Sequence, residues 1–141
     1  KGVSNGKVID ADKEYAVAED YRKKLKTKCP SVEQNVGNLS GGNQQKVLLA
    51  KWMFAEPDIL ILDEPTRGID VGAKYEIYCI INDLVAAGKS VIMISSELPE
   101  VLGMSDRIYI MNEGKFVVEV SKEEATSELI MSKIVKSGKG A

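Results

Sequence analysis

Residues 58–65 have the sequence DILILDEP, in which an unbroken aliphatic run is followed by two acids and a proline. An aliphatic run of this length is typical of a strand that is buried on both faces, and such strands are mostly parallel. We therefore expect a strand over 58–62, covered on both sides and ending at Asp63 and Glu64. The carboxyl end of a buried parallel strand is where open α/β sheets bind their ligands.

The two acids at this strand end differ in the chemistry that they could perform. Asp63 could hold a hydrated Mg²⁺, which prefers one or two carboxylates together with phosphate oxygens. Glu64 could orient and deprotonate an attacking water. The simpler alternative is a strand that ends in solvated acids at a turn, with Pro65 stopping the strand.

Helical and strand patterns alternate around this stretch, which favours an α/β fold. The spacing of apolar residues predicts helices over 12–28, ended by Pro30, and over 42–54. A helix over 71–87 should end at Gly88. Further elements are a strand over 91–94, a short helix over 98–102 and a hairpin over 107–120 with its turn at 112–114. We expect the helix over 71–87 to bury five side chains: Tyr75, Tyr78, Ile81, Leu84 and Val85.

A last helix is predicted to reach residue 136. Ser121 and Glu124 have the spacing of a capping box, in which each side chain bonds the other's backbone N–H at a helix start. We therefore expect this pair to begin the last helix.

Residues 39–45, LSGGNQQ, form the second candidate site. Gly41 and Gly42 at the start of a helix leave backbone N–H groups open to close approach, and Ser40 adds a hydroxyl donor. Such donors suit an anion. The alternative is a serine N-cap followed by a flexible glycine pair. Residues 66–70, TRGID, read as a polar loop in which Asp70 caps the next helix.

The bulk composition narrows the function classes. The 141 residues carry a net charge of -2 without a long basic tract, which argues against a dedicated nucleic-acid binder. No apolar stretch approaches the roughly 20 residues that span a bilayer. The spacing of Cys29 and Cys79 is unlike a metal site, and we interpret both as reduced thiols.

The order and spacing of these motifs resemble the signature, Walker B and D-loop segments of ABC ATPases. The longer stretches LSGGNQQK (39–46), DEPTRGIDVG (63–72) and SSELPE (95–100) are similar to the second ATPase domain of the fused double-ATPase subunits of ribose, galactose and xylose importers. The likeness covers residues 10–136. It implies an α/β P-loop NTPase (ABC ATPase) fold. Residues 1–54 would be part of its helical subdomain, and 55–141 would be the C-terminal part of the ATPase core.

The resemblance implies an ATP hydrolase that drives monosaccharide import, with ATP and Mg²⁺ as cofactors. Asp63 and Glu64 would be the catalytic pair, with Asp63 holding Mg²⁺ through water. The nucleotide-binding residues would be Ser40, Gly41, Gly42, Asn43, Asp70 and Ser96. In the family, the signature serine and second glycine contact ATP held by the opposite ATPase domain. Two positions depart from the usual pattern: Asn43 replaces the glutamine of many ABC proteins, and Ser96 replaces the switch histidine. The second departure is similar to this importer class, and it puts hydrolysis at the domain's own site in doubt, because the histidine normally contacts the γ-phosphate.

The resemblance also implies partners and a location. The partners would be an opposite ATPase domain, membrane permease subunits and, indirectly, a periplasmic or surface sugar-binding protein, without nucleic acid. The location would be peripheral, on the cytoplasmic face of the plasma (inner) membrane. Two rival functions stay open: a non-transport ABC ATPase of DNA repair or translation, and a non-catalytic regulatory half-domain. The identity of the sugar is not encoded in these motifs.

The phosphate loop G-x-x-x-x-G-K-[ST] is missing from the sequence. Residues 2–8 have one residue too few between the glycines and lack the final Ser or Thr. Residues 88–90 have the right ending but join a helix to a strand. We therefore expect a truncated fold without ATPase activity of its own. The resemblance also implies that the strand over 91–94 pairs with 58–62 and that its other edge, where the phosphate-loop strand would lie, stays open. An open aliphatic edge favours self-association or a rearranged sheet.

Overall fold

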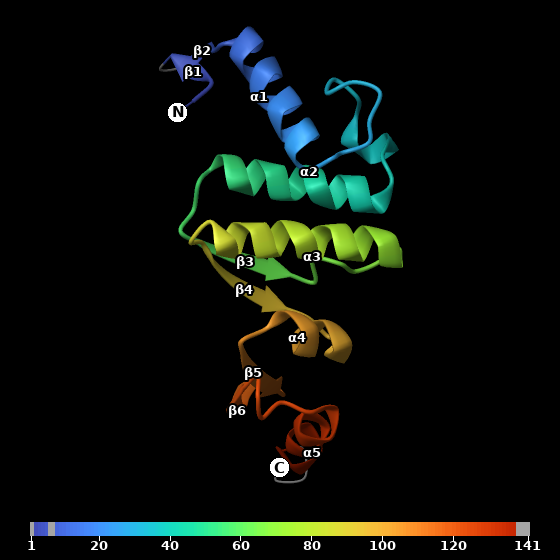
Figure 1. Ribbon diagram of the computed structural model, residues 1–141, viewed down its shortest axis with the longest axis vertical. Coiled ribbons are helices and arrows are strands. Elements are labelled where there is room, and N and C mark those ends of the chain that lie inside the picture. The colour runs from blue at the N-terminus through green and yellow to red at the C-terminus, as the bar shows by residue number, and fades with distance from the viewer. Residues whose placement is uncertain (1, 6–7, 138–141) are drawn as a thin grey trace. The chain divides into compact units, whose positions relative to one another are not determined.

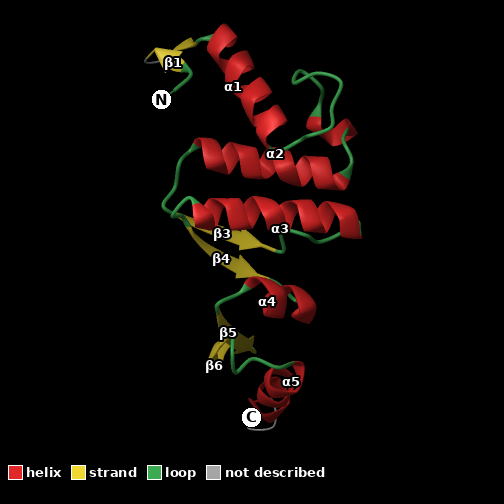
Figure 2. Cartoon of the chain, viewed as in Figure 1, coloured by secondary structure: helices red, strands yellow, loops and turns green. Residues whose placement is uncertain are grey.

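The computed structural model describes residues 2–5 and 8–137, which fall into two compact units. The first unit comprises the described residues up to Ile61 together with Pro65–Ile92. The second comprises Leu62–Glu64 and the described residues from Met93 onward. Helices and strands alternate along the chain (Figure 2), as the α/β prediction requires. Residues 6–7 of the rejected phosphate-loop candidate lie outside the described residues.

The first unit is mainly helical. After a small antiparallel hairpin come a long helix, a short 3-10 turn and two helices that run side by side (Figure 1). Among the residues described, no helix is both long and apolar enough to cross a membrane. The elements are β1 (Ser4–Asn5), β2 (Val8–Ile9), α1 (Ala11–Lys24), η1 (Val36–Asn38), α2 (Gly41–Phe54) and α3 (Val71–Ala86).

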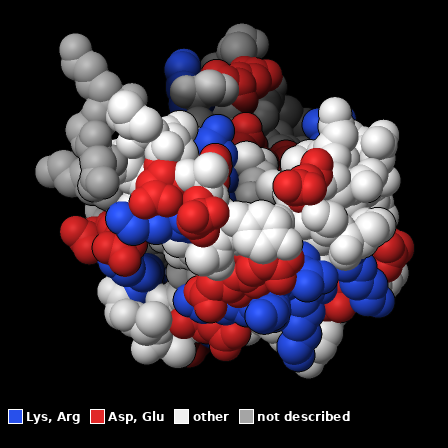
Figure 3. Space-filling model, turned by 90° about the horizontal axis from the view of Figure 1, so that it is seen from above, with Lys and Arg blue, Asp and Glu red and all other residues white. Residues whose placement is uncertain are grey.

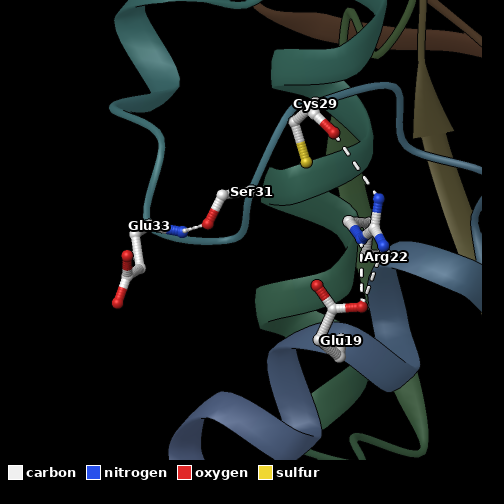
Figure 4. A network of polar contacts seen from close by, with 5 residues as sticks. All are labelled: Glu19, Arg22, Cys29, Ser31 and Glu33. Carbon is white, nitrogen blue, oxygen red and sulfur yellow. Dashed lines mark hydrogen bonds and ion pairs between the residues drawn. The ribbon is translucent and has the colours of Figure 1, made fainter.

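Helix α1 ends four residues earlier than predicted, well before Pro30. Lys26 adopts a left-handed conformation with φ of 51°, and the Thr27 N–H bonds the Arg22 carbonyl at 2.9 Å. This is the Schellman pattern that closes a helix, here formed without the usual glycine. The Arg22 guanidinium bonds Glu19 at 2.9 Å and the Cys29 carbonyl at 3.5 Å, which ties the following loop back to α1 (Figure 4).

The ends of α3 confirm the sequence prediction, whereas of the five side chains expected to be buried only Ile81 is fully buried. Asp70 caps the start, and Gly88, with φ of 85°, follows the last turn. The buried residues are Ile77, Ile80 and Ile81, which follow Ala73 at helical spacing and continue the face toward α2. Two side chains expected to be buried are exposed, Tyr75 by 68% and Val85 by 47%. The apolar residues of α3 occur on all sides of the helix, so their spacing alone did not identify the face that packs.

Strands β3 (Ile59–Asp63) and β4 (Ser90–Ile94) pair with each other, as predicted. The prediction that β3 is covered on both faces is wrong. Leu60 and Leu62 are buried, whereas the alternate residues Ile59 and Ile61 are 60% and 66% exposed. Among the described residues, packing therefore covers only one face of this strand.

The second unit is a hairpin packed against two helices, α4 (Leu98–Met104) and α5 (Ser127–Ser137). Strands β5 (Arg107–Asn112) and β6 (Lys115–Ser121) are antiparallel. The turn consists of Glu113 and Gly114, both with positive φ, as tight hairpin turns require. Its core is formed by Ile108, Ile110, Val120 and Ile130.

The predicted capping box of the last helix is wrong. Ser121 and Glu124 do contact each other, at 3.1 Å between side-chain oxygens, but Ser121 is the last residue of β6. The contact closes the turn that follows the strand. Helix α5 begins at Ser127, and the Thr126 hydroxyl accepts from the Leu129 N–H at 3.1 Å. Thr126 therefore supplies the cap, because its hydroxyl is three residues before an open N–H.

Gly42→Ala should destabilise the first unit. An added Cβ would lie 2.6 Å from the Cβ of Ala73, closer than two carbons can pack, so α2 and α3 must move apart. We expect a loss of about 1–3 kcal/mol in the free energy of urea unfolding. Adding Ala73→Gly should recover most of the loss. Gly103→Ala, which meets open space, is the control and should not destabilise the chain. Equal stability of the Gly42 variant would contradict the close contact.

Candidate functional site

A pocket of about 270 Å³ in the first unit gathers four of the predicted nucleotide-binding residues. Ser40 precedes helix α2 in an extended conformation and makes no capping bond to the helix backbone. The first N–H groups of α2 therefore lack a side-chain cap from this serine. The pocket is lined by Lys28, Ser40, Gly42, Asn43, Asp70, Gly72, Ala73 and Glu76.

The two signature glycines differ in environment. Gly41 is exposed, whereas Gly42 is buried against Ala73 of helix α3. The sequence predicted two open glycines, so the burial of Gly42 is a correction. Its lack of a side chain serves helix packing, while the residue still lines the pocket.

Asn43 connects the signature turn to the loop that follows α1. Its Oδ1 accepts from the Lys28 N–H at 2.8 Å, and its Nδ2 donates to the Ser40 hydroxyl oxygen at 2.8 Å. Both ends of the amide are thus bonded within the protein.

Asp70 sits where the loop after β3 enters helix α3. Its Oδ1 accepts from the Ala73 N–H at 2.9 Å, which confirms the predicted cap. The preceding Gly68 has φ of 74°, a backbone conformation that glycine adopts without strain. This turn places Asp70 beside Ser40 and Gly42 in one pocket.

An ion pair that the sequence did not reveal joins the helices beneath the pocket. The Lys46 ammonium, on a side chain only 2% exposed, lies 2.8 Å from the Glu76 carboxylate and 3.1 Å from the Lys26 carbonyl oxygen. A charged lysine is almost never fully buried unless it is paired. The hydrogen bond from Lys46 lowers the pKa of Glu76 below its ordinary value. Lys46 follows Gly42 by one helical turn, which is the only signal that the sequence offers.

The acidic pair at the end of β3 belongs to the second unit. Glu64 has a left-handed backbone, with φ of 47°, an uncommon conformation for a residue with a side chain. Its N–H bonds the Ile94 carbonyl at 2.9 Å, and its carboxylate accepts from the Ser96 N–H at 3.0 Å. Both bonds come from the end of β4 and the loop after it. They hold the carboxylate of Glu64 at the strand end.

Asp63 is exposed at the same strand end and suits a hydrated cation. Among the described residues, no cluster of three or more histidine, cysteine or acidic side chains could enclose a metal ion. Magnesium bound with a nucleotide needs only one or two protein carboxylates, because phosphate and water supply the other oxygens. The donor set at Asp63 therefore fits Mg²⁺ brought by a nucleotide.

The structure thus forms two groups from the predicted residues. Ser40, Gly42, Asn43 and Asp70 line one pocket in the first unit, with Gly41 beside it in sequence. Glu64 and Ser96 are hydrogen-bonded in the second unit, next to Asp63. Each group is defined within its own unit.

Two other surface features differ from these groups. A cavity of about 280 Å³ between α1, α2 and the loop after α1 is lined mainly by apolar residues, among them Val17, Tyr21, Val47 and Phe54, so it does not suit a phosphate. The face of the molecule shown in Figure 3 carries acidic and basic side chains in mixture. A phosphate-backbone binder would concentrate positive charge.

Comparison with known proteins identifies the domain to which these groups belong. Residues 4–67 match the model of the ABC transporter family. The fold is similar to that of an ATP-binding cassette of an ABC transporter solved in its ADP conformation, with a TM-score of 0.73 and 26% identity over 96% of this chain and 54% of that one. The chain is a segment of an ABC transporter ATP-binding domain.

Curated relatives of this ABC segment are named as sugar transport proteins. It is 63% identical over 135 residues to the L-arabinose transport ATP-binding protein of Geobacillus stearothermophilus, covering 96% of this chain and 26% of the relative. It is 58% identical over 132 residues to a xylose import ATP-binding protein of Geobacillus kaustophilus, covering 94% and 26%. A ribose import ATP-binding protein of Clostridium tetani is 58% identical over 125 residues, covering 89% and 25%. The chain spans about a quarter of the length of these relatives.

The Lys46–Glu76 pair predicts a pH dependence of stability. Because the folded protein lowers the pKa of Glu76, the pair stabilises the fold at pH values above the ordinary glutamate pKa of 4.5. This contribution is lost as the pH falls through the lowered value. Urea unfolding at pH 7 and pH 3 should therefore show a smaller pH difference in Lys46→Met than in the parent chain. Lys13→Met, which removes an exposed ion pair with Asp10, is the control. An unchanged pH difference in Lys46→Met would refute this role.

Proposed function

We propose that this chain is part of the ATP-binding subunit of a monosaccharide ABC importer, in which ATP binding and hydrolysis drive sugar uptake. The observation that carries the proposal is the identity of 63% over 135 residues with an L-arabinose transport ATP-binding protein. Xylose and ribose import proteins match nearly as well, so the substrate class is a monosaccharide. All three relatives are named for transport, which favours this function over DNA repair, translation or a regulatory half-domain.

The pocket that contains Ser40, Gly42, Asn43 and Asp70, called the signature pocket below, would bind the phosphates of a nucleotide carried by the opposite ATPase domain. Ser40 supplies a hydroxyl, and the start of α2 supplies backbone N–H groups at the positive end of a helix. Gly41 and Gly42 keep side chains out of the approach, and Asn43 and Asp70 complete the wall. This arrangement supports binding of an anion from outside the chain.

The acids at the end of β3 would serve the chain's own nucleotide. Asp63 would hold Mg²⁺ through water, and the cation would neutralise charge on the phosphates. Glu64 would orient and deprotonate the attacking water. The bond from the Ser96 N–H limits the positions that the Glu64 carboxylate can adopt, which supports a positioning role for the loop after β4. Phosphate-loop contacts would come from residues that this sequence does not contain, so the chain alone should not hydrolyse ATP.

The partners follow from the same proposal. They are an opposite ATPase domain, permease subunits in the membrane and, through the permease, an extracytoplasmic sugar-binding protein. The importer would place this segment at the cytoplasmic face of the membrane. Neither group of site residues resembles a nucleic-acid interface, since neither concentrates positive charge.

A hybrid protein tests the proposed function. The matching segment of the Geobacillus stearothermophilus L-arabinose transport protein would be replaced by this chain, and ATP turnover would be measured with its permease partners. We expect the hybrid to hydrolyse ATP. Ser40→Ala should lower turnover by at least about tenfold, because one preorganised donor to a developing charge is worth that much or more.

One control variant and two further measurements accompany the hybrid. Ser31→Ala, which removes a hydroxyl from the loop before η1, should leave turnover close to that of the parent hybrid. Glu64→Gln should lower turnover if the chain's own nucleotide is hydrolysed. An inactive but folded hybrid, or a Ser40 variant as active as the parent, would refute the proposal. ATP turnover by the isolated chain that is abolished by Glu64→Gln would contradict its expected inactivity.

A further inference from the structure

The amide of Asn43 has only one possible orientation. A backbone N–H can only donate, so the atom of Asn43 that faces the Lys28 N–H at 2.8 Å must be its oxygen. The NH₂ group then faces the Ser40 hydroxyl, 2.8 Å away. The loop after α1 thus determines which end of the amide meets the serine.

This orientation sets the direction of the Ser40 hydroxyl. A hydroxyl has one hydrogen to donate and lone pairs that accept. Because an NH₂ group cannot accept, Ser40 must be the acceptor in the contact with Asn43. Its hydrogen therefore points away from Asn43 and remains available to the pocket that Ser40 lines.

We propose that Asn43 is a positioning residue that holds the Ser40 hydroxyl as a hydrogen-bond donor toward a phosphate in this pocket. The inference rests on the proposed function, and it changes the expected role of Asn43 from nucleotide contact to orientation of its neighbour. With both ends of its amide bonded inside the protein, Asn43 acts through Ser40.

Each carboxylate of the pocket has one oxygen bonded to a donor of the protein. Asp70 accepts from the Ala73 N–H at 2.9 Å, and Glu76 accepts from the Lys46 ammonium at 2.8 Å. Neither is bonded to Ser40 by a contact seen among the described residues. The Ser40 hydroxyl and the first N–H groups of α2 are then among the donors that an incoming phosphate meets, beside Lys28, which also lines the pocket.

Asn43→Asp tests the orientation with almost no change in shape. A carboxylate can still accept from the Lys28 N–H, but it also accepts from the Ser40 hydroxyl, which turns the hydrogen away from the pocket. Pyrophosphate would be titrated into the isolated chain while NMR follows the amide signals of residues 40–43. We expect saturable shifts in the parent chain and an affinity at least about tenfold weaker in Asn43→Asp, as for a lost hydrogen bond to a charged group.

Asn38→Asp is the matched control for the added charge. Asn38 lies in η1, two residues before Ser40 in sequence, and is exposed, so this variant adds the same charge at a side chain with no bond to Ser40 among the described contacts. Its affinity should fall by less than about threefold, as expected for a screened surface charge. An equal loss in both variants would attribute the effect to charge and overturn the inference.

A double-mutant cycle separates positioning from a structural role. Asn43→Ala should weaken pyrophosphate binding in the parent chain but have almost no effect when Ser40→Ala is already present. Thermal unfolding of each variant shows any general loss of stability, which would be the same in both backgrounds. Additive losses of affinity, or no saturable binding by the parent chain, would overturn the inference. ATP hydrolysis by the hybrid protein tests the proposed function separately, because turnover by the hybrid supports that function whether or not Asn43 is the residue that orients Ser40.

Discussion

The close contact between helices α2 and α3 determines the shape of the signature pocket. Gly42 and Lys46 lie one turn apart on α2, and Ala73 and Glu76 lie one turn apart on α3. The missing side chain at Gly42 lets the helices approach until only Ala73 separates them, and the buried Lys46 ammonium then reaches Glu76 at 2.8 Å. An ammonium buried to this extent is tolerated only because a carboxylate and the Lys26 carbonyl compensate it. Three of these four positions, Gly42, Ala73 and Glu76, line the pocket, and Lys46 holds Glu76 from within the protein.

Local signals in the sequence predicted elements that depend on local bonds. The cap at Asp70 and the end of α3 at Gly88 were recognisable, because each rests on a residue type that favours one backbone conformation. The pairing of β3 with β4 is not local, and it was predicted from the family resemblance. The end of α1 was not. Lys26 adopts a left-handed conformation that lysine rarely prefers, and its carbonyl is held by Lys46, twenty residues away. A contact at that separation leaves no pattern in the sequence of the helix itself. The exposed face of β3 was missed for a related reason, since an aliphatic run does not show which packing layers are present.

The residues of the candidate site could be predicted from their types and spacing, but the contacts between them could not. Residues 39–45 and Asp70 were identified as anion-binding and capping residues, and the structure brings Ser40, Gly42, Asn43 and Asp70 to one pocket. The bond from Lys28 to Asn43 required knowledge of the loop after α1, which the early end of that helix determines. Gly42 shows that one residue can have two reasons for its identity, since it both packs against α3 and lines the pocket. Motif analysis alone identifies only the role in the pocket and not the packing against α3.

The loop after β4 shows how a site can lose a usual side chain and keep a contact. Ser96 stands where the resemblance leads one to expect a histidine, yet the bond to the Glu64 carboxylate is made by its backbone N–H at 3.0 Å. A backbone donor does not depend on which side chain the residue carries. The left-handed backbone of Glu64 and the bond from its N–H to Ile94 bring the carboxylate to that donor. The backbone bond to Glu64 is therefore available with either residue. In the proposed site, the exchange would change what the position offers to a phosphate, since a neutral hydroxyl replaces an imidazole that can carry charge.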